Sequence, residues 1–389
     1  MPPHISSLLL ACLISTGLPA TLAMAQTDAE TRRLLPELHL LDPPWVSPTI
    51  YRESVLLLQE NDGEPLVGRL AFPVEELIEV RAADGSRLLK PGTDFQLGSD
   101  RRTLQFAATS DLPFVKMGDL FLPSGSPDSY AHRTGHPEQS LMYHPGKWFH
   151  SRQFEVTYRR SKAEWPDSAP ALAKKHLPRT LELLKSGKSL KLVVAGDSIA
   201  AGGDASLHAG VAPHMPAFPE LVAAQLQEHY GIPVTLKNLA VGGTSISHGV
   251  ASLEKYVAEQ PDLLIIAFGM NDVGRRDPVW FKAETQKLID GAKTALPDSE
   301  ILLVAPMIGN AEWVHTPREM FPKYRDALAE LTGPRVALAD LTSAWALLLE
   351  HKHDLDMTGN GLNHPNDFGH RLYAQTILGL LVPPSSAGQ

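Results

Sequence analysis

Cysteine is almost absent from this chain of 389 residues. Its single cysteine, Cys12, lies in an apolar stretch close to the N-terminus. If that stretch is removed, no thiol remains, which excludes a cysteine nucleophile, a thiolate metal site and a disulfide framework. A region rich in glycine and proline holds four further candidate ligands, His132, His136, His144 and His150. No helix is expected there to bring them together, so we expect neither a metal nor another cofactor.

Charged residues are missing from the first 25 positions, which contain no Asp, Glu, Lys or Arg. An apolar stretch opens at Leu8 and ends in Ala23-Met24-Ala25, before a polar glutamine. This pattern predicts a cleaved signal peptide at residues 1–25, so the mature protein is expected to be secreted or periplasmic. No later segment reaches the roughly 18 apolar residues that a membrane span requires.

An excess of basic residues is also missing. The 35 Lys and Arg are outnumbered by 44 Asp and Glu, which leaves a net charge of −9. That balance argues against a nucleic acid or an anionic membrane as partner. The chain is longer than a typical single domain, which favours two domains.

The first of these domains is predicted to be all β. Short extended runs at 54–58, 77–80 and 154–158 are separated by turn signals such as Asn-Asp-Gly at 61–63. Several short strands with such turns predict a small β-sandwich, an accessory domain over residues 40–160. Prolines at 166, 170 and 178 mark the linker that follows.

From residue 190 apolar runs alternate with stretches of helical spacing. The runs lie at 190–195, 234–241, 263–267, 301–305 and 336–341. Strands that alternate with helices require a parallel sheet covered on both faces. The sequence therefore predicts a three-layer α/β/α sandwich with a parallel five-stranded sheet, over residues 188–382.

Chemically useful residues follow three of these strands. Ser198 ends the first run, Gly243 follows the second, and Asn271 follows the third, while His364 lies near the C-terminus. The carboxyl ends of parallel strands meet at one crevice. Acyl transfer through serine needs a nucleophile, a base and oxyanion donors, and these four residues can supply them.

In order and spacing, four blocks resemble the SGNH (GDSL-like) hydrolase family: Gly-Asp-Ser at 196–198, Asn-Leu-Ala-Val-Gly-Gly at 238–243, Gly-Met-Asn-Asp at 269–272 and Asn-His-Pro-Asn-Asp at 363–367. The resemblance implies that Ser198 is the nucleophile and His364 the base. It also implies three oxyanion donors: the Ser198 N–H, the N–H of Gly243 with Gly242 as the neighbouring alternative, and the side chain of Asn271.

The last block departs from the family pattern, in which an aspartate stands three residues before the histidine. This chain has Gly361 there. Asp367 is expected to serve the start of the following helix, where a carboxylate meets free N–H groups. The partners that remain open for the ring of His364 are Asp356, a backbone carbonyl, Asn360 and Asn363.

Several neighbouring residues have structural interpretations. Asp197 and Asp272 are expected to hold strand-end turns through backbone N–H groups. His370 is expected on the surface of the last helix. Trp148 and Phe149 can stack on a sugar, although single aromatic residues before a strand belong more often to the core.

We therefore expect a secreted serine esterase that works through an acyl-enzyme on a small-molecule or polysaccharide ester. The resemblance and the preceding β domain suggest that the substrate is an acetyl group on a polysaccharide. Two alternatives stay open: a glycan-binding protein without turnover, and an O-acyltransferase that uses the same serine.

Overall fold

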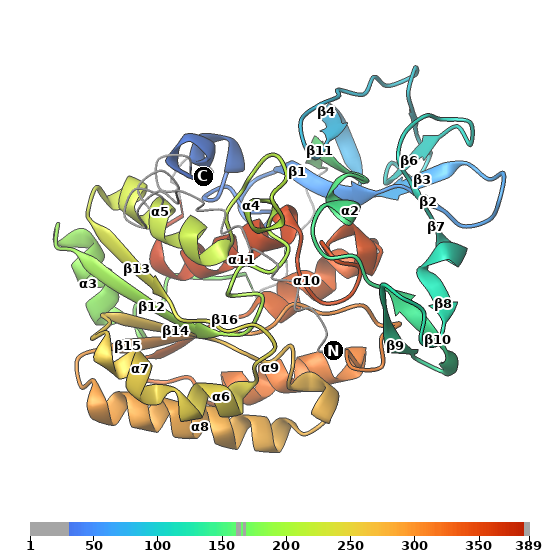
Figure 1. The fold of residues 1–389 in the computed structure, drawn as a ribbon. Coiled ribbons are helices and arrows are strands. Elements are labelled where there is room, and N and C mark those ends of the chain that lie inside the picture. Colours follow the sequence, from blue (N-terminus) through green and yellow to red (C-terminus); the bar gives the residue numbers. More distant parts are fainter. Residues whose placement is uncertain (1–30, 161–164, 166–168, 385–389) are drawn as a thin grey trace, which may run out of the picture.

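The computed structural model describes residues 31–160, 165 and 169–384. Figure 1 shows two parts, a group of β-sheets and a layered α/β body. The predicted signal peptide at 1–25 lies outside the described residues.

The α/β body is built on one parallel sheet with the strand order β13-β12-β14-β15-β16. The strands are β12 (Leu190–Gly196), β13 (Val234–Asn238), β14 (Leu263–Ala267), β15 (Glu300–Val304) and β16 (Val336–Ala339). They coincide with the five predicted runs. Residues 192–195 of β12 are fully buried because the central strand is covered on both faces.

Helices form the two outer layers of this body. Figure 1 shows α5 (Phe218–Tyr230), α10 (Leu341–Leu349) and α11 (Asp367–Leu381) on one face of the sheet, and α6 (Ile246–Ala251), α7 (Leu253–Ala258), α8 (Pro278–Ala295) and α9 (Phe321–Ala329) on the other. Two further helices are α3 (Pro178–Lys185) and α4 (Ser206–Ala209). No helix in the described part of the chain is long and apolar enough to cross a membrane. The α/β sandwich is thus confirmed.

The β part consists of three sheets. The first has the order β1-β11-β4, with β1 (Thr49–Leu56), β11 (Gln153–Arg160) and β4 (Val74–Ala82). The second, β5-β6-β3-β2-β7, joins β5 (Gln96–Leu97), β6 (Thr103–Phe106), β3 (Leu66–Arg69), β2 (Leu58–Gln59) and β7 (Val115–Lys116). The third, β8-β10-β9, joins β8 (Phe121–Pro123), β10 (His136–Met142) and β9 (Ser129–Arg133). The short helix α2 (Lys147–His150) precedes β11.

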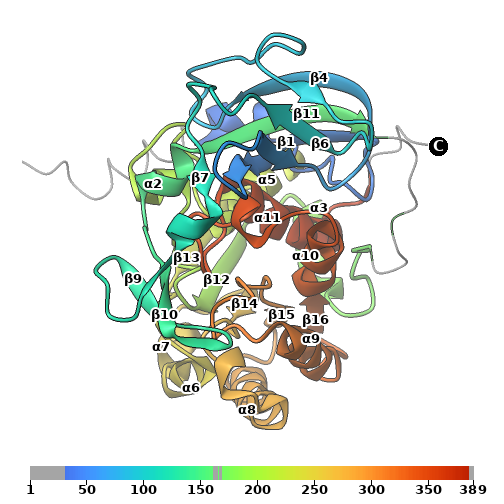
Figure 2. The same ribbon diagram turned by 90° about the vertical axis from the view of Figure 1, so that its right-hand side faces the viewer.

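The prediction of a small β-sandwich is met only in part, because the third sheet does not belong to a simple two-sheet packing. Strand β9 has no fully buried residue. In Figures 1 and 2 the β9–β10 hairpin reaches away from β1 and β4 towards the α/β body. Strands that bury neither face show little alternation of apolar and polar residues, so this hairpin was not recognisable in the sequence.

One hydrophobic cluster runs through both parts of the molecule and includes Val55 and Tyr158 as well as Val193. Buried polar contacts join them too. The ammonium group of Lys352 donates to Glu53 Oε1 at 2.7 Å and to the Ser54 carbonyl at 2.7 Å. Both charged side chains have 0% exposure. The β part is therefore anchored in the segment that leads to His364.

Candidate active site

Ser198 lies two residues beyond the end of β12, where the backbone is closely packed. A Cβ on Gly196 would stand 2.6 Å from Ala200 Cβ and 2.8 Å from the Ala267 carbonyl, so only glycine fits there. The next residues turn and leave Ser198 half-buried. His364 Nε2 lies 2.8 Å from Ser198 Oγ, across 166 residues of sequence. The structure thus joins the predicted nucleophile and base.

The opposite nitrogen of the ring has a partner that the sequence did not reveal. His364 Nδ1 lies 2.8 Å from Asp204 Oδ2. A carboxylate can only accept, so Nδ1 carries the proton and Nε2 is left to accept from the hydroxyl of Ser198. Serine, histidine and aspartate therefore form one hydrogen-bonded chain with the geometry of a catalytic triad.

Asp204 is held on a turn between the two parts of the molecule. Its φ of +56° is left-handed, a conformation that aspartate tolerates better than most residues. A Cβ on Gly203 would lie 2.8 Å from His364 Nδ1, so the loop can pass the ring only with glycine there. From the β part, the Gly146 N–H donates to Asp204 Oδ1 at 2.7 Å, and His150 Nε2 lies 2.9 Å from the Asp204 carbonyl.

These contacts keep Asp204 ionised. Burial by itself raises the pKa of a carboxyl group, but here the hydrogen bond and charge of His364 and the N–H of Gly146 outweigh it. The pKa of Asp204 is therefore lowered. An anion at this position can stabilise a protonated imidazole at His364.

The two aspartates considered from the sequence are engaged elsewhere. The carboxylate of Asp356 accepts the N–H groups of Leu56 and His353, both at 2.8 Å. It fixes the loop to β1 and does not contact the ring. Asp367 lies at the start of α11 as expected, but its Oδ1 accepts from the Ser206 N–H at 2.8 Å.

The asparagine and carbonyl alternatives are replaced by Asp204 as well. Asn360 Oδ1 accepts the N–H groups of Leu362, Asn363 and His364 at 2.9–3.3 Å. Asn363 Oδ1 in turn accepts from Asn360 Nδ2. Both side chains shape the loop instead of orienting the ring.

The structure also explains the glycine at the family's aspartate position. Gly361 has a φ of +83°, which disfavours any side chain. A Cβ there would stand 2.5 Å from the ring of Phe149. Phe149 is fully buried, so its core interpretation is confirmed, and it occupies the space that a local acid would need.

The predicted oxyanion donors gather beside Ser198. A Cβ on Gly242 would lie 3.8 Å from Ser198 Cβ, and Gly243 needs its glycine because its φ is +74°. Asn271 Nδ2 donates to the Thr244 carbonyl at 2.9 Å, which ties its side chain to this loop and leaves its second amide hydrogen free. The N–H groups of Ser198 and Gly243 have no acceptor among the described residues.

Asp197 and Asp272 hold turns, as expected. Asp197 Oδ1 accepts from the Ile199 N–H at 3.0 Å, and Asp272 Oδ1 accepts from the Ile246 N–H at 3.1 Å. Burial raises the pKa of Asp197 to about 7 and that of Asp272 to about 6. Both carboxyl groups thus fix the backbone of the loops that carry the candidate catalytic residues.

The expectation for His370 was wrong. The side chain is buried at 0% exposure, and its Nε2 lies 3.1 Å from the Gly203 carbonyl. Burial lowers the pKa of His370 to about 4, so the ring is neutral. The sequence placed His370 on the surface of the last helix, but the loop that carries Asp204 covers it.

The four histidines of the β part do not form a metal site. His150 contacts Asp204, and His144 stacks on Trp148 with ring centroids 5.2 Å apart. Within residues 31–160 and 169–384, no group of three or more His, Cys, Asp or Glu is arranged to hold a metal.

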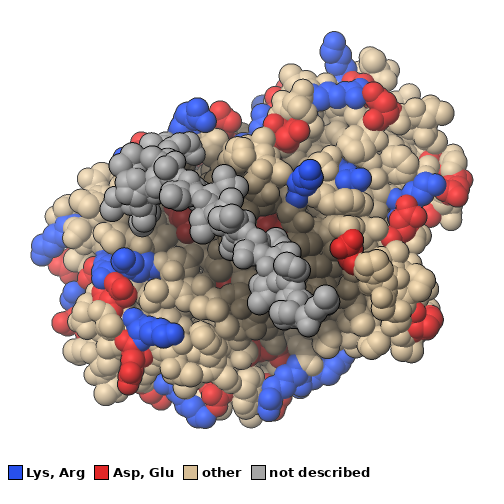
Figure 3. All heavy atoms as spheres, in the orientation of Figure 1, with Lys and Arg blue, Asp and Glu red and all other residues tan. Residues whose placement is uncertain are grey.

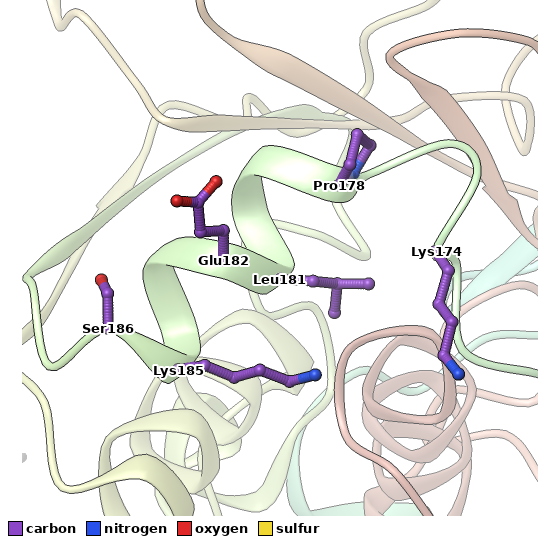
Figure 4. Close-up of a pocket in the computed structure, with 6 residues that line it drawn as sticks. All are labelled: Lys174, Pro178, Leu181, Glu182, Lys185 and Ser186. Carbon is purple, nitrogen blue, oxygen red and sulfur yellow. The ribbon is translucent and has the colours of Figure 1, made fainter.

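A surface hollow of about 480 Å³ lies along α3, between Pro178, Leu181 and Lys185 (Figure 4). Its lining residues, 174–186, lead into the N-terminal end of β12, whereas Ser198 follows the C-terminal end of that strand. The hollow is therefore separate from the site. On the uncovered part of the face in Figure 3, acidic and basic side chains are interspersed.

Comparison with protein families decides the assignment, because the model of the GDSL-like lipase/acylhydrolase family matches residues 194–372. This segment is a GDSL-like lipase/acylhydrolase domain. The GDSL-like domain lies within the predicted boundaries and contains the strands and loops that carry Ser198, Asn271 and His364.

Several solved structures resemble part of this chain. A two-domain esterase active on acetylated mannans is 22% identical, with 54% of this chain and 52% of that chain covered and a TM-score of 0.43. The chain thus spans about half of that esterase. An acetyl xylan esterase from Geobacillus stearothermophilus is 20% identical over 50% and 96% of the two chains, with a TM-score of 0.40. A lipase/acylhydrolase from Enterococcus faecalis is 21% identical over 49% and 93%, with a TM-score of 0.39. A search of curated proteins finds no match.

Proposed function

We propose that this chain is a serine esterase that removes acetyl groups from a polysaccharide. The observation that carries the esterase activity is the continuous hydrogen-bonded chain from Ser198 Oγ through His364 to Asp204, with both links at 2.8 Å. Free N–H donors beside the serine complete the requirements for acyl transfer.

In the first half of the reaction, Ser198 Oγ attacks the ester carbonyl while its proton passes to His364 Nε2. Asp204 stabilises the imidazolium that results. The carbonyl oxygen becomes an oxyanion, which the N–H groups of Ser198 and Gly243 and the free amide hydrogen of Asn271 receive. His364 then returns the proton to the leaving sugar hydroxyl, and acetyl remains on the serine.

In the second half, His364 takes a proton from water and the resulting hydroxide attacks the acetyl carbon. The same donors receive the second oxyanion. The Ser198 oxygen leaves with the proton from His364, and acetate is released. Every proton passes through His364 Nε2, which lies 2.8 Å from Ser198 Oγ.

Exposure of the site supports a polymeric substrate. Gly242, Gly243 and Asn271 are exposed, while the ring of His364 is 15% exposed. A reacting carbonyl can therefore reach Ser198 while the rest of a long chain stays outside. We further propose that residues 40–160 are an accessory domain that shapes this entrance for the hydrolase domain at 188–382, because Gly146 already contacts Asp204.

We also propose that the protein is secreted or periplasmic, because the first 25 residues lack charge and end in a small-residue motif. N-terminal sequencing of the protein exported by a bacterial host should begin at Gln26. Recovery of an uncleaved chain from the cytoplasm would argue against export.

Hydrolysis of 4-nitrophenyl acetate by the purified chain tests the esterase activity. Ser198→Ala deletes one oxygen and should lower kcat by a factor on the order of 10⁶. Ser247→Ala is a matched control, since this serine is exposed on α6 and its hydroxyl makes no hydrogen bond to the described residues. Turnover by the Ser198 variant above roughly a hundredth of wild type would point to another nucleophile.

Two measurements separate the alternatives. A glycan-binding protein without turnover would show no nitrophenol release. An O-acyltransferase would pass acetyl to an added oligosaccharide, whereas an esterase releases free acetate at the same rate with or without that acceptor.

A further inference from the structure

An aromatic cluster lies where the β9–β10 hairpin meets the α/β body. It consists of Tyr130, Tyr143, Trp313 and His315. Tyr130 meets Tyr143 edge-on with ring centroids 4.5 Å apart, and it meets Trp313 at 5.7 Å. Trp313 in turn meets His315 edge-on at 5.1 Å. Two rings come from the β part and two from the loop after β15.

Hydrogen bonds also hold the hairpin to that loop. The Thr134 N–H donates to the Glu312 carbonyl at 2.7 Å, and the Val314 N–H donates to the His132 carbonyl at 3.1 Å. The indole N–H of Trp313 donates to a hairpin carbonyl at 3.2 Å. The rings are therefore fixed in place before any ligand arrives, which lowers the entropic cost of binding.

The cluster stands between two loops of the catalytic site. On one side, Asn310 of the same loop bonds the Gly361 carbonyl at 2.8 Å, three residues before His364. On the other, a Cβ on Gly274 would lie 2.9 Å from the His315 carbonyl, three residues after Asn271. Burial raises the pKa of Tyr143, and the negative charge of Asp204 raises it further, as expected for neighbours.

The cluster also leaves apolar surface in water. Tyr130 is 46% exposed, and it is the one aromatic residue among seven large apolar side chains exposed in the described part of the chain. Another of the seven, Val314 at 38%, follows Trp313 in the loop after β15. An exposed apolar patch beside a site marks a binding surface.

We propose that Tyr130 and Trp313 form a subsite for a pyranose ring of the acetylated polysaccharide, so that a sugar next to the acetylated one stacks on the aromatic cluster. The inference rests on the proposed function. A pyranose presents an apolar face of C–H groups, which an aromatic face matches, and a polar edge that Arg133 and Glu312 can meet from their ion pair at 2.7 Å.

The test compares a polymeric with a small substrate in the full chain. For Tyr130→Ala, the ratio of kcat/KM on acetylated xylan or mannan oligosaccharides to kcat/KM on 4-nitrophenyl acetate should fall about three- to tenfold, through a higher KM. Tyr130→Phe keeps the ring and should retain the ratio. Ile78→Ala removes a similarly exposed side chain from β4 and serves as control.

A second measurement does not depend on turnover. In the Ser198→Ala background, calorimetric titration with the same oligosaccharides should give a Kd that Tyr130→Ala raises three- to tenfold. An unchanged Kd and ratio in Tyr130→Ala would overturn the subsite, as would a wild type that hydrolyses 4-nitrophenyl acetate but neither oligosaccharide. If wild type hydrolyses none of the three esters, the proposed function itself fails.

Discussion

The acid of the triad comes from the loop after the nucleophile, and Asp204→Asn tests its role directly. In wild type, Asp204 Oδ1 accepts from Gly146 and Oδ2 accepts from His364 Nδ1. The amide that replaces the carboxylate keeps its oxygen on the Gly146 N–H and turns its NH₂ towards the ring. Nδ1 must then accept, so the ring proton moves to Nε2 and faces Ser198 Oγ.

That tautomer cannot take the proton of Ser198. We expect kcat to fall by roughly 10³–10⁴, which corresponds to about 4–5.5 kcal/mol of transition-state stabilisation, with KM little changed. Initial rates on 4-nitrophenyl acetate over a range of concentrations measure both constants. Circular dichroism and a thermal melt establish that the variant is folded.

Asp356→Asn is the matched control, because Asp356 is equally buried and was the candidate from the sequence. Its carboxylate holds the N–H groups of Leu56 and His353. The amide oxygen can accept one of these N–H groups, but the amide NH₂ would face the other N–H, donor against donor. Stability should therefore fall by about 1–3 kcal/mol while kcat changes little. A loss of kcat below tenfold in folded Asp204→Asn, or a larger loss in Asp356→Asn, would refute the assignment.

Three further outcomes are expected. Asn271→Ala should lower kcat by about 10²–10³ with little change in KM, measured on the same ester, because an oxyanion donor acts in the transition state. Lys352→Met should lower the free energy of unfolding in urea by about 3–5 kcal/mol, since Glu53 stays buried without its cation, and Glu53→Gln added to it should restore part of the loss. For Asp197, with a pKa near 7 when folded and about 3.9 when unfolded, the folded state holds the extra proton, so stability falls as pH rises between these values. Asp197→Asn removes this dependence, so the stability of the variant relative to wild type should rise by roughly 2–3 kcal/mol as the pH of the urea melts rises from 5 to 8.

The strands of the α/β body were predictable because they are buried on both faces. A fully buried parallel strand is a continuous apolar run, and such runs are easy to recognise in sequence. Ser198 and Asn271 follow two of these strands directly, so their convergence followed from topology. Helix α11 was predictable too, but not that a loop covers His370.

Asp204 was not predictable in the same way. It lies 160 residues from His364, and no periodicity connects a loop residue to a partner at that distance. Its signal was local and easily overlooked: an aspartate six residues after Ser198, preceded by Gly202 and Gly203. Two glycines allow the chain to pass close to another group, which here is the imidazole ring.

The buried ion pair between Lys352 and Glu53 limits how the two parts can move. Many two-part enzymes close around a ligand by rotation about exposed linking loops. Here such a rotation would separate the pair inside an apolar interior, and Arg371 would lose the Tyr51 carbonyl that it bonds at 3.0 Å. The position of the β part beside Ser198 and His364 is therefore set when the chain folds. Any ligand that contacts both parts must therefore fit the arrangement that folding sets, because rotating the β part away would break the buried pair.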